Sequence, residues 1–152
     1  MRIKYICLAM AVLFLAACGY KPITGTVVDA ETGKPIEGAV VLVEWTKAEG
    51  VPGLTSTKSF KVIEKLTDKD GKVTIEGISD ISVDPPDLTV YKKGYVAWNN
   101  ESIFPEYKKR TDFKWKNGYV FKLERFKPEY SYVEHTSFIH SAINLGLGEG
   151  KK

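Results

Sequence analysis

Hydrophobic residues along most of this chain occur in short runs with the alternation of β-strands, and glycine, proline, aspartate and asparagine separate the runs. The pattern predicts strands at 23–28, 39–46, 60–67, 72–78, 88–91 with a continuation over 96–98, and 118–125. About seven short strands spaced by turns are typical of an all-β, seven-stranded Greek-key sandwich.

The segments between the predicted strands have the composition of turns and loops. Residues 68–71, Asp-Lys-Asp-Gly, predict a tight hairpin, because glycine adopts positive φ without strain. Residues 47–58 are predicted to be a loop, as are residues 79–87, where two consecutive prolines prevent ladder pairing. Residues 39–46 carry apolar side chains on both faces, which predicts a central strand.

Helical spacing occurs only near the C-terminus. Ser131 and Glu134 match a capping box, so we predict a helix over 131–145, with Gly146 as its stop. Its predicted packing stripe consists of Val133, Thr136, Ile139, His140 and Ile143. The glycine-rich end after this helix is predicted to be a disordered tail.

The N-terminus has the three parts of a secretory signal. Arg2 and Lys4 precede an uninterrupted apolar run over 6–15, and small residues follow it. The sequence Leu-Ala-Ala-Cys over 15–18 resembles the lipobox of bacterial lipoproteins. That resemblance implies cleavage before Cys18, lipidation of Cys18 and a location in the bacterial cell envelope. Gly19 stands where the family's inner-membrane retention signal is usually Asp, which favours the outer membrane.

Removal of the signal changes both the charge and the cysteine count. The net charge of +3 falls to about +1 without Arg2 and Lys4, so charge gives no case for nucleic acid. Cys7 leaves with the signal and Cys18 carries the lipid, so the mature chain has no free thiol for a metal or disulfide. The expected organisation is a signal at 1–17, a lipidated tether at 18–21, a sandwich at 22–126, and a helix with a tail at 127–152.

Three motifs resemble the carboxypeptidase regulatory-like domain. They are I-x-G-x-V-x-D-x-x-T-G-x-P-I-x-G-A-x-V from residue 23, T-D-x-D-G-K-V-x-I from residue 67, and L-T-V at 88–90 followed by Gly-Tyr at 94–95. The resemblance implies a transthyretin-like (prealbumin-like) sandwich. The residues of these motifs serve turns and buried strands, and none is a reactive group, so the motifs indicate a fold and no activity.

Candidate catalytic and metal-binding residues are few. His135 and His140, five positions apart on a helix, point about 140° apart and cannot share a metal. Asp68 and Asp70 lack the further ligands of a calcium loop. No nucleophile elbow, zinc motif or phosphate loop occurs, so we expect no enzyme activity and no cofactor. The alternative is a small hydrolase on the same scaffold, which would need a histidine beside carboxylates in a cleft.

The segment from 98 to 115 is the one unusual region. It interleaves aromatic and cationic side chains, a combination that can bind proteins or glycans. The candidate binding residues are Trp98, Phe104, Tyr107, Lys109, Arg110, Phe113 and Trp115. The alternative is a long connection whose aromatic rings pack against the sandwich. The sequence thus favours a lipid-anchored, non-enzymatic envelope protein that acts as a binding or structural module, or as an accessory subunit of an envelope complex.

Overall fold

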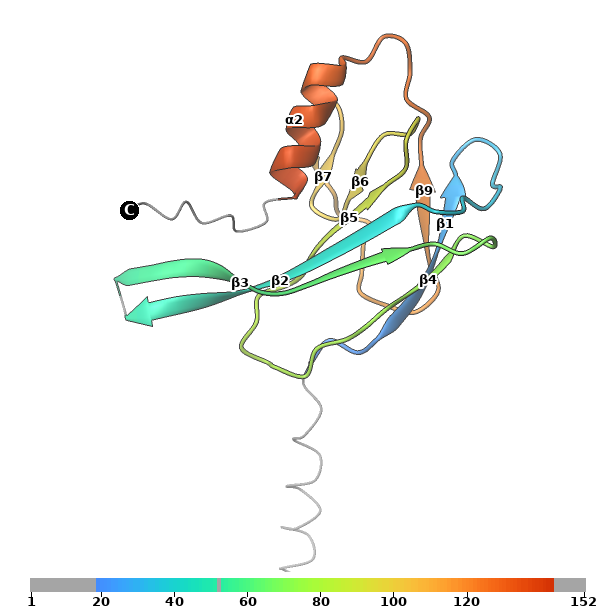
Figure 1. Cartoon of the computed structure of the whole chain (residues 1–152). Helices are drawn as coiled ribbons and strands as arrows, with labels where there is room; N and C mark the ends of the chain where they lie inside the picture. The colour runs from blue at the N-terminus through green and yellow to red at the C-terminus, as the bar shows by residue number, and fades with distance from the viewer. Residues whose placement is uncertain (1–18, 52, 144–152) are drawn as a thin grey trace, which may run out of the picture.

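The computed structural model describes residues 19–51 and 53–143. The described chain is mostly β, with one helix near its C-terminal end (Figure 1). The strands are β1 (Ile23–Asp29), β2 (Val40–Val51), β3 (Leu54–Leu66), β4 (Lys72–Ile75), β5 (Asp87–Tyr91), β6 (Trp98–Asn99), β7 (Ser102–Ile103), β8 (Lys108–Lys109) and β9 (Tyr119–Leu123). The helix is α2 (Tyr132–Ala142).

Seven of these strands form two larger sheets, and the other two form a small one. One large sheet has the order β4-β1-β9 and the other has the order β3-β2-β5-β6, while β7 pairs with β8. The pairing of β1 with β9 is parallel, whereas β1 with β4 and every pair in the four-stranded sheet are antiparallel. The first and last strands therefore lie side by side in one sheet.

Alternate residues of the two large sheets form a shared core. Val41, Val43 and Trp45 of β2 face Val27 of β1 and Phe121 of β9, and all five side chains are fully buried. Gly25 makes room for this packing, because a Cβ at that position would collide with the ring of Phe121. The inner faces of both sheets thus supply one sandwich core, as the alternation in the sequence predicts.

The predicted loop over 47–58 is wrong, because both strands continue through it as a two-stranded ribbon. β2 and β3 stay in register from Thr46 opposite Ser59 to Val51 opposite Leu54. Figure 1 shows this ribbon extending beyond the body of the sandwich. The ribbon has no buried face, and apart from the apolar residues at its tip its side chains are mostly polar, so the sequence carries no apolar alternation to reveal it.

Two of the motifs from the sequence bond to each other. The buried hydroxyl of Thr67 accepts from the backbone N–H of Ala39 at 2.8 Å and donates to the carbonyl of Ile36 at 2.7 Å. The backbone N–H of Val27 donates to the carbonyl of Gly71 at 2.8 Å, and Gly71 has φ of +70° in the predicted hairpin turn. The turn after β1 and the hairpin before β4 are therefore one bonded unit.

Helix α2 begins where the capping box predicts. The Oγ of Ser131 accepts from the N–H of Glu134 at 3.3 Å. The predicted packing stripe is confirmed at Ile139 and Ile143, which face the sheet. It is wrong at Val133, which is 76% exposed, and at Thr136 and His140, which are also exposed. The buried residues of the helix are His135, Phe138 and Ala142, and Phe138 belongs to the apolar cluster beneath it. The predicted stop at Gly146 lies outside the described residues.

Within residues 19–51 and 53–143, α2 is the one helix, and neither its length nor its polarity would let it span a bilayer. Its docking surface is the outer face of the four-stranded sheet. The hydroxyl of Thr89 in β5 donates to the carbonyl of Ala142 at 3.0 Å, and Phe138 packs with Val96, Ala97 and Phe104 in a second apolar cluster. Helix α2 thus covers part of the outer face of the four-stranded sheet, and the polar residue Thr89 is buried there.

Candidate functional site

The segment over 98–115 does not present its aromatic residues on one surface. Trp98 is buried, with ring centroids 5.4 Å from Phe113 and 4.9 Å from Phe121. The guanidinium carbon of Arg110 lies 4.5 Å from the ring centroid of Trp98, and Arg110 Nε donates to the carbonyl of Asn99 at 2.7 Å. These three predicted residues, Trp98, Phe113 and Arg110, are engaged in packing on the sandwich.

Phe104 and Trp115 pack at two other places. Phe104 is buried in the cluster under α2, 5.6 Å from Phe138 between ring centroids. Trp115 meets the ring of Trp45 edge-on at 5.8 Å, and its Nε1 donates to the carbonyl of Lys21 at 2.8 Å. The aromatic residues of the segment are therefore divided among three packing sites.

Tyr107 and Lys109 are the exposed members of the candidate set. Tyr107 is 49% exposed and has φ of +53°, a left-handed conformation that is unusual for a non-glycine residue. Its ring meets that of Phe138 edge-on, with 5.5 Å between the ring centroids, and Lys109 is exposed in β8. The surface on which this segment could bind a partner is thus the small sheet of β7 and β8, and such binding stays a prediction.

The two histidines are not arranged for hydrolysis. His135 is buried among the rings of Tyr91, Phe104 and Phe126, and its Nε2 accepts from the N–H of Ala97 at 2.9 Å. Burial lowers the pKa of His135 below its ordinary value. His140 is exposed, and neither histidine lines one of the larger pockets of the described residues.

The carboxylate of Asp68 is used in the turn of the hairpin. One oxygen of Asp68 accepts from the N–H of Asp70 at 2.9 Å and from the N–H of Lys72 at 2.8 Å. Among residues 19–51 and 53–143, no three His, Cys, Asp or Glu side chains gather in a way that could hold a metal ion. Asp68 therefore has a structural role in closing this turn.

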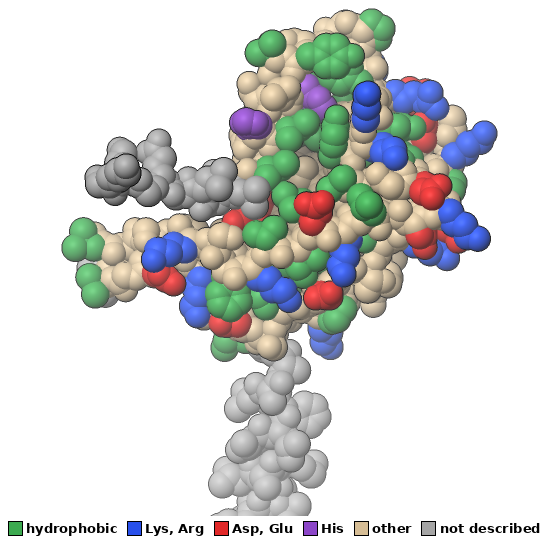
Figure 2. Space-filling model, viewed as in Figure 1, with side chains coloured by type: hydrophobic (Ala, Val, Ile, Leu, Met, Phe, Trp, Pro, Cys, Tyr) green, Lys and Arg blue, Asp and Glu red, His purple; other side chains and the backbone are tan. Residues whose placement is uncertain are grey.

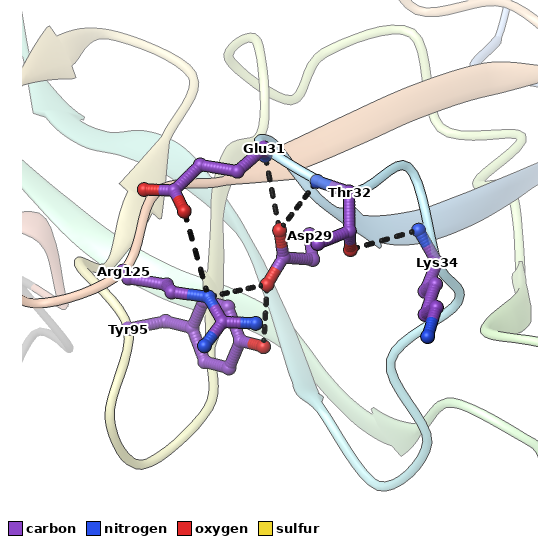
Figure 3. A network of polar contacts seen from close by, with 6 residues as sticks. All are labelled: Asp29, Glu31, Thr32, Lys34, Tyr95 and Arg125. Carbon is purple, nitrogen blue, oxygen red and sulfur yellow. Dashed lines mark hydrogen bonds and ion pairs between the residues drawn. The ribbon is translucent and has the colours of Figure 1, made fainter.

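A polar network that the sequence did not reveal surrounds Asp29 at the end of β1 (Figure 3). One carboxylate oxygen accepts from the N–H groups of Glu31 and Thr32, at 3.0 and 2.9 Å. The other accepts from the hydroxyl of Tyr95 at 3.0 Å and from Arg125 Nε at 2.8 Å. These bonds, of which the Thr32 N–H contributes most, hold the pKa of Asp29 far below its usual range.

The Asp29 network joins three separate segments. Asp29 ends β1, Tyr95 follows the turn at Gly94, and Arg125 follows β9. Burial and the bond to Asp29 raise the pKa of Tyr95, so its hydroxyl stays protonated as a donor. With both carboxylate oxygens occupied, the network holds chain segments together and offers no free base for catalysis.

Polar residues are also buried on the outer face of the four-stranded sheet. Asn99 Nδ2 donates to Asp87 at 2.8 Å and to the hydroxyl of Thr89 at 3.1 Å. Burial raises the pKa of Asp87 to about 6, and the nearby carboxylates of Glu101 and Glu44 contribute in the same direction. This strip is continuous with an apolar groove between α2 and the sheet, lined by Val40, Leu42, Glu64, Thr89, Tyr91, Ile139 and Ile143.

Large apolar side chains are exposed mainly along β3 and at the tip of the ribbon. Phe60 is 47% exposed, Val62 44%, Leu66 64% and Leu54 79%. β3 is an outer strand of its sheet, and along its second edge it pairs with no strand in the described part of the chain. Figure 2 shows apolar side chains at the tip of the ribbon and on the neighbouring surface. An unpaired edge with apolar side chains is a surface on which another protein can add a strand.

Comparison with known proteins assigns no family. No protein-family model matches the sequence, and no curated protein matches it. A variant of the shaft pilin SpaA from Lactobacillus rhamnosus GG is similar in structure, with 18% identity and a TM-score of 0.44 over 72% of this chain and 46% of that one. A streptococcal ancillary pilin has 16% identity and a TM-score of 0.39, over 74% of this chain and 31% of that one.

A second SpaA variant is 20% identical, with a TM-score of 0.42 over 72% of this chain and 47% of that one. The chain therefore spans less than half the length of these solved pilins. Likenesses this distant assign neither a family nor a function.

Proposed function

We propose that this chain is a lipid-anchored, non-enzymatic protein of the bacterial cell envelope, and that its β-sandwich binds a protein partner. The observation that carries the binding role is the outer strand β3, 13 residues long, with exposed Phe60, Val62 and Leu66. The lipobox at 15–18 supports the anchor at Cys18. The three sequence motifs support a transthyretin-like, Greek-key arrangement of the carboxypeptidase regulatory-like kind.

The chemistry of the β3 edge favours a protein over a glycan as its partner. An extended peptide can bond to the open backbone edge, while alternate side chains such as Val62 and Leu66 supply apolar contacts. Lys61 and Lys65 alternate with Val62 and Leu66 along β3 and therefore lie on its opposite face, where both form ion pairs with Glu76. Lysines on an outer strand oppose indiscriminate pairing, so the edge is suited to one specific partner strand.

The small sheet of β7 and β8 is a second candidate contact. Tyr107 and Lys109 are exposed there, next to α2. A Tyr107→Ser, Lys109→Glu double variant tests this contact without disturbing Arg110, whose side chain packs on Trp98. Retention of the same crosslinked partner by this variant would restrict the binding role to β3.

The test of the β3 edge is crosslinking in intact envelopes followed by recovery of the chain. Val62→Thr with Phe60→Ser removes apolar surface at partly exposed positions, so we expect the fold to be retained and a discrete crosslinked adduct to be lost. Val133→Thr is the control, because Val133 is also an exposed apolar residue, at 76%, but lies on α2. Loss of the adduct in both variants, or in neither, would contradict a specific role for β3.

The anchor is tested separately by labelling with radioactive palmitate. The Cys18→Ala variant should lose the label and leave the membrane fraction, because a diacylglyceryl group with an N-acyl chain anchors stably whereas the sandwich has no such group. An unchanged distribution of this variant would exclude the lipid anchor while leaving the β3 test intact.

A further inference from the structure

The chain is fixed to the sandwich almost as soon as it leaves the predicted lipidation site. Tyr20 forms an isolated bridge with Ile78, and the N–H of Ile78 donates to the carbonyl of Tyr20 at 2.7 Å. The two backbones approach so closely at Gly77 that a Cβ there would collide with the carbonyl of Tyr20. Tyr20 is therefore held on the sandwich and cannot form part of a long, flexible tether.

The short distance between Cys18 and Tyr20 limits how far the sandwich can lie from an attached lipid. Two residues span at most about 7 Å when fully extended. This distance is comparable to the thickness of the headgroup layer of a bilayer, roughly 5–8 Å on each side of the hydrocarbon core. A lipid on Cys18 would thus bring this end of the sandwich into contact with the membrane surface.

The side chains at this end are those that suit a lipid–water interface. We define the anchor face by Tyr20, Lys21, Ile81, Trp115 and Lys116. Tyr20 and Trp115 are half-buried and meet edge-on at 5.8 Å, while the indole N–H of Trp115 donates to the carbonyl of Lys21. Ile81 is 74% exposed in the loop after β4. Figure 1 shows the described chain beginning beside this loop, at the lower end of the molecule.

The charges of this end also agree with a surface of lipid headgroups. Lys21 and Lys116 are exposed, and neither forms an ion pair within the described residues 19–51 and 53–143. The neighbouring carboxylates are already paired, Glu76 with Lys61 and Lys65, and Asp80 with Lys47. Free ammonium groups beside tyrosine and tryptophan rings are the arrangement that binds phosphate headgroups while the rings lie among them.

We propose that the anchor face lies in the headgroup layer of the membrane that the lipid on Cys18 enters, and that it fixes the orientation of the sandwich. This inference rests on the proposed lipidation of Cys18. β1 leads away from the anchor face, so the turn that contains Lys34 and the Asp29 network lies at the membrane-distal end. The outer strand β3 then presents its free edge to the compartment beside the membrane.

The test places a nitroxide spin label on lipidated protein in vesicles of phosphatidylethanolamine and phosphatidylglycerol. Lys116→Cys puts the label on the anchor face, and Lys34→Cys puts it on the distal turn as the matched control, since both lysines are exposed. We expect the collision rate of the label at 116 with a water-soluble nickel chelate to be at least about threefold lower than at 34, as for groups at interfacial depth. Collision with dissolved oxygen should be higher at 116.

A second variant removes the attraction between the two lysines and the lipid headgroups, and it leaves Tyr20 and Trp115 unchanged. Lys21→Glu with Lys116→Glu changes two exposed charges, and a label at Ile81→Cys should then become more accessible to the nickel chelate while the protein stays in the membrane fraction. Equal accessibility at 116 and 34 in membrane-bound protein would overturn the proposed orientation and leave the anchor standing. Failure of the protein to acquire lipid at all would overturn both proposals.

Discussion

Arg125 Nε lies 2.8 Å from Oδ2 of Asp29, although 96 residues separate the two in the sequence. The bond joins the end of the first strand to the segment that follows the last strand. Tyr95 adds its hydroxyl to the same carboxylate oxygen, at 3.0 Å. This network therefore links the parallel pair of β1 and β9 to the turn before β6.

The Asp29 network should make folding stability depend on pH in the acid range. The pKa of Asp29 is depressed in the fold, so its bonds contribute fully above the unfolded pKa of about 3.9 and are lost as the pH falls below it. We expect Asp29→Ala to destabilise the protein more than Arg125→Ala, because it also leaves the N–H groups of Glu31 and Thr32 without this acceptor.

Urea unfolding of both variants and the natural chain at pH 7 and pH 3 measures this. The difference in the free energy of unfolding between Asp29→Ala and the natural chain should be smaller at pH 3 than at pH 7. If Asp29→Ala lowers the free energy of unfolding by the same amount at both pH values, the proposed role of the ionised carboxylate is contradicted.

Mild acidification should weaken the docking of α2, because it protonates His135. Burial depresses its pKa, so the neutral ring is favoured in the fold and its contribution is present above the unfolded value of about 6.5. As the pH falls below that value, protonation removes the acceptor for the N–H of Ala97. Hydrogen exchange of the Ala97 amide should therefore speed up relative to amides of β2. His135→Gln should abolish this pH dependence, whereas His140→Gln should not.

Asp87 should titrate near pH 6, about two units above an ordinary aspartate. The pKa of Asp87 is raised, so its effect on stability runs opposite to that of Asp29. Its contribution to the free energy of unfolding is greatest below the unfolded pKa and falls as the pH rises through about 6. Carboxyl-carbon NMR resolves this titration. Glu101→Gln should lower the pKa of Asp87 by removing a nearby negative charge, and an unchanged pKa would exclude a contribution from Glu101.

The hydroxyl of Thr67 should be required where the two turn motifs meet. Thr67→Val keeps the shape of the side chain but leaves the N–H of Ala39 without its acceptor, a loss we expect to cost about 1–3 kcal/mol in the free energy of unfolding. Thr67→Ser restores the hydroxyl and should recover much of that loss. Chemical denaturation of the two variants side by side tests the assignment, and equal stabilities would refute it.

The sequence predicted those parts of the fold in which local chemistry and burial agree. The strands with one buried face and the hairpin at Gly71 are confirmed, and so is the helix start at Ser131. The ribbon of β2 and β3 escaped prediction because it is solvated on both faces. Parallel pairing of β1 with β9 leaves no local trace, since strand order depends on contacts between distant residues.

The candidate site illustrates a second limit of sequence reasoning. Trp98, Phe104 and Tyr107 have similar surroundings in the sequence, yet two are buried and one is exposed. Composition cannot distinguish an aromatic residue that packs from one that binds, because both uses favour the same side chains. Asp29 was part of a turn motif, but its partner Arg125 was too far along the chain to be recognised.

The proposed lipobox would send the chain across a membrane, and the parallel pairing of the first and last strands then has a consequence for export. A chain that crosses a membrane from its N-terminus emerges with β1 exposed while its neighbour is still inside the pore. The carbonyl of Thr24 accepts from the N–H of Gly118, and its own N–H donates to Asn117, 93 residues further on, so neither bond can form until nearly the whole domain has crossed. During such export, completion of the three-stranded sheet would be deferred to the end of translocation.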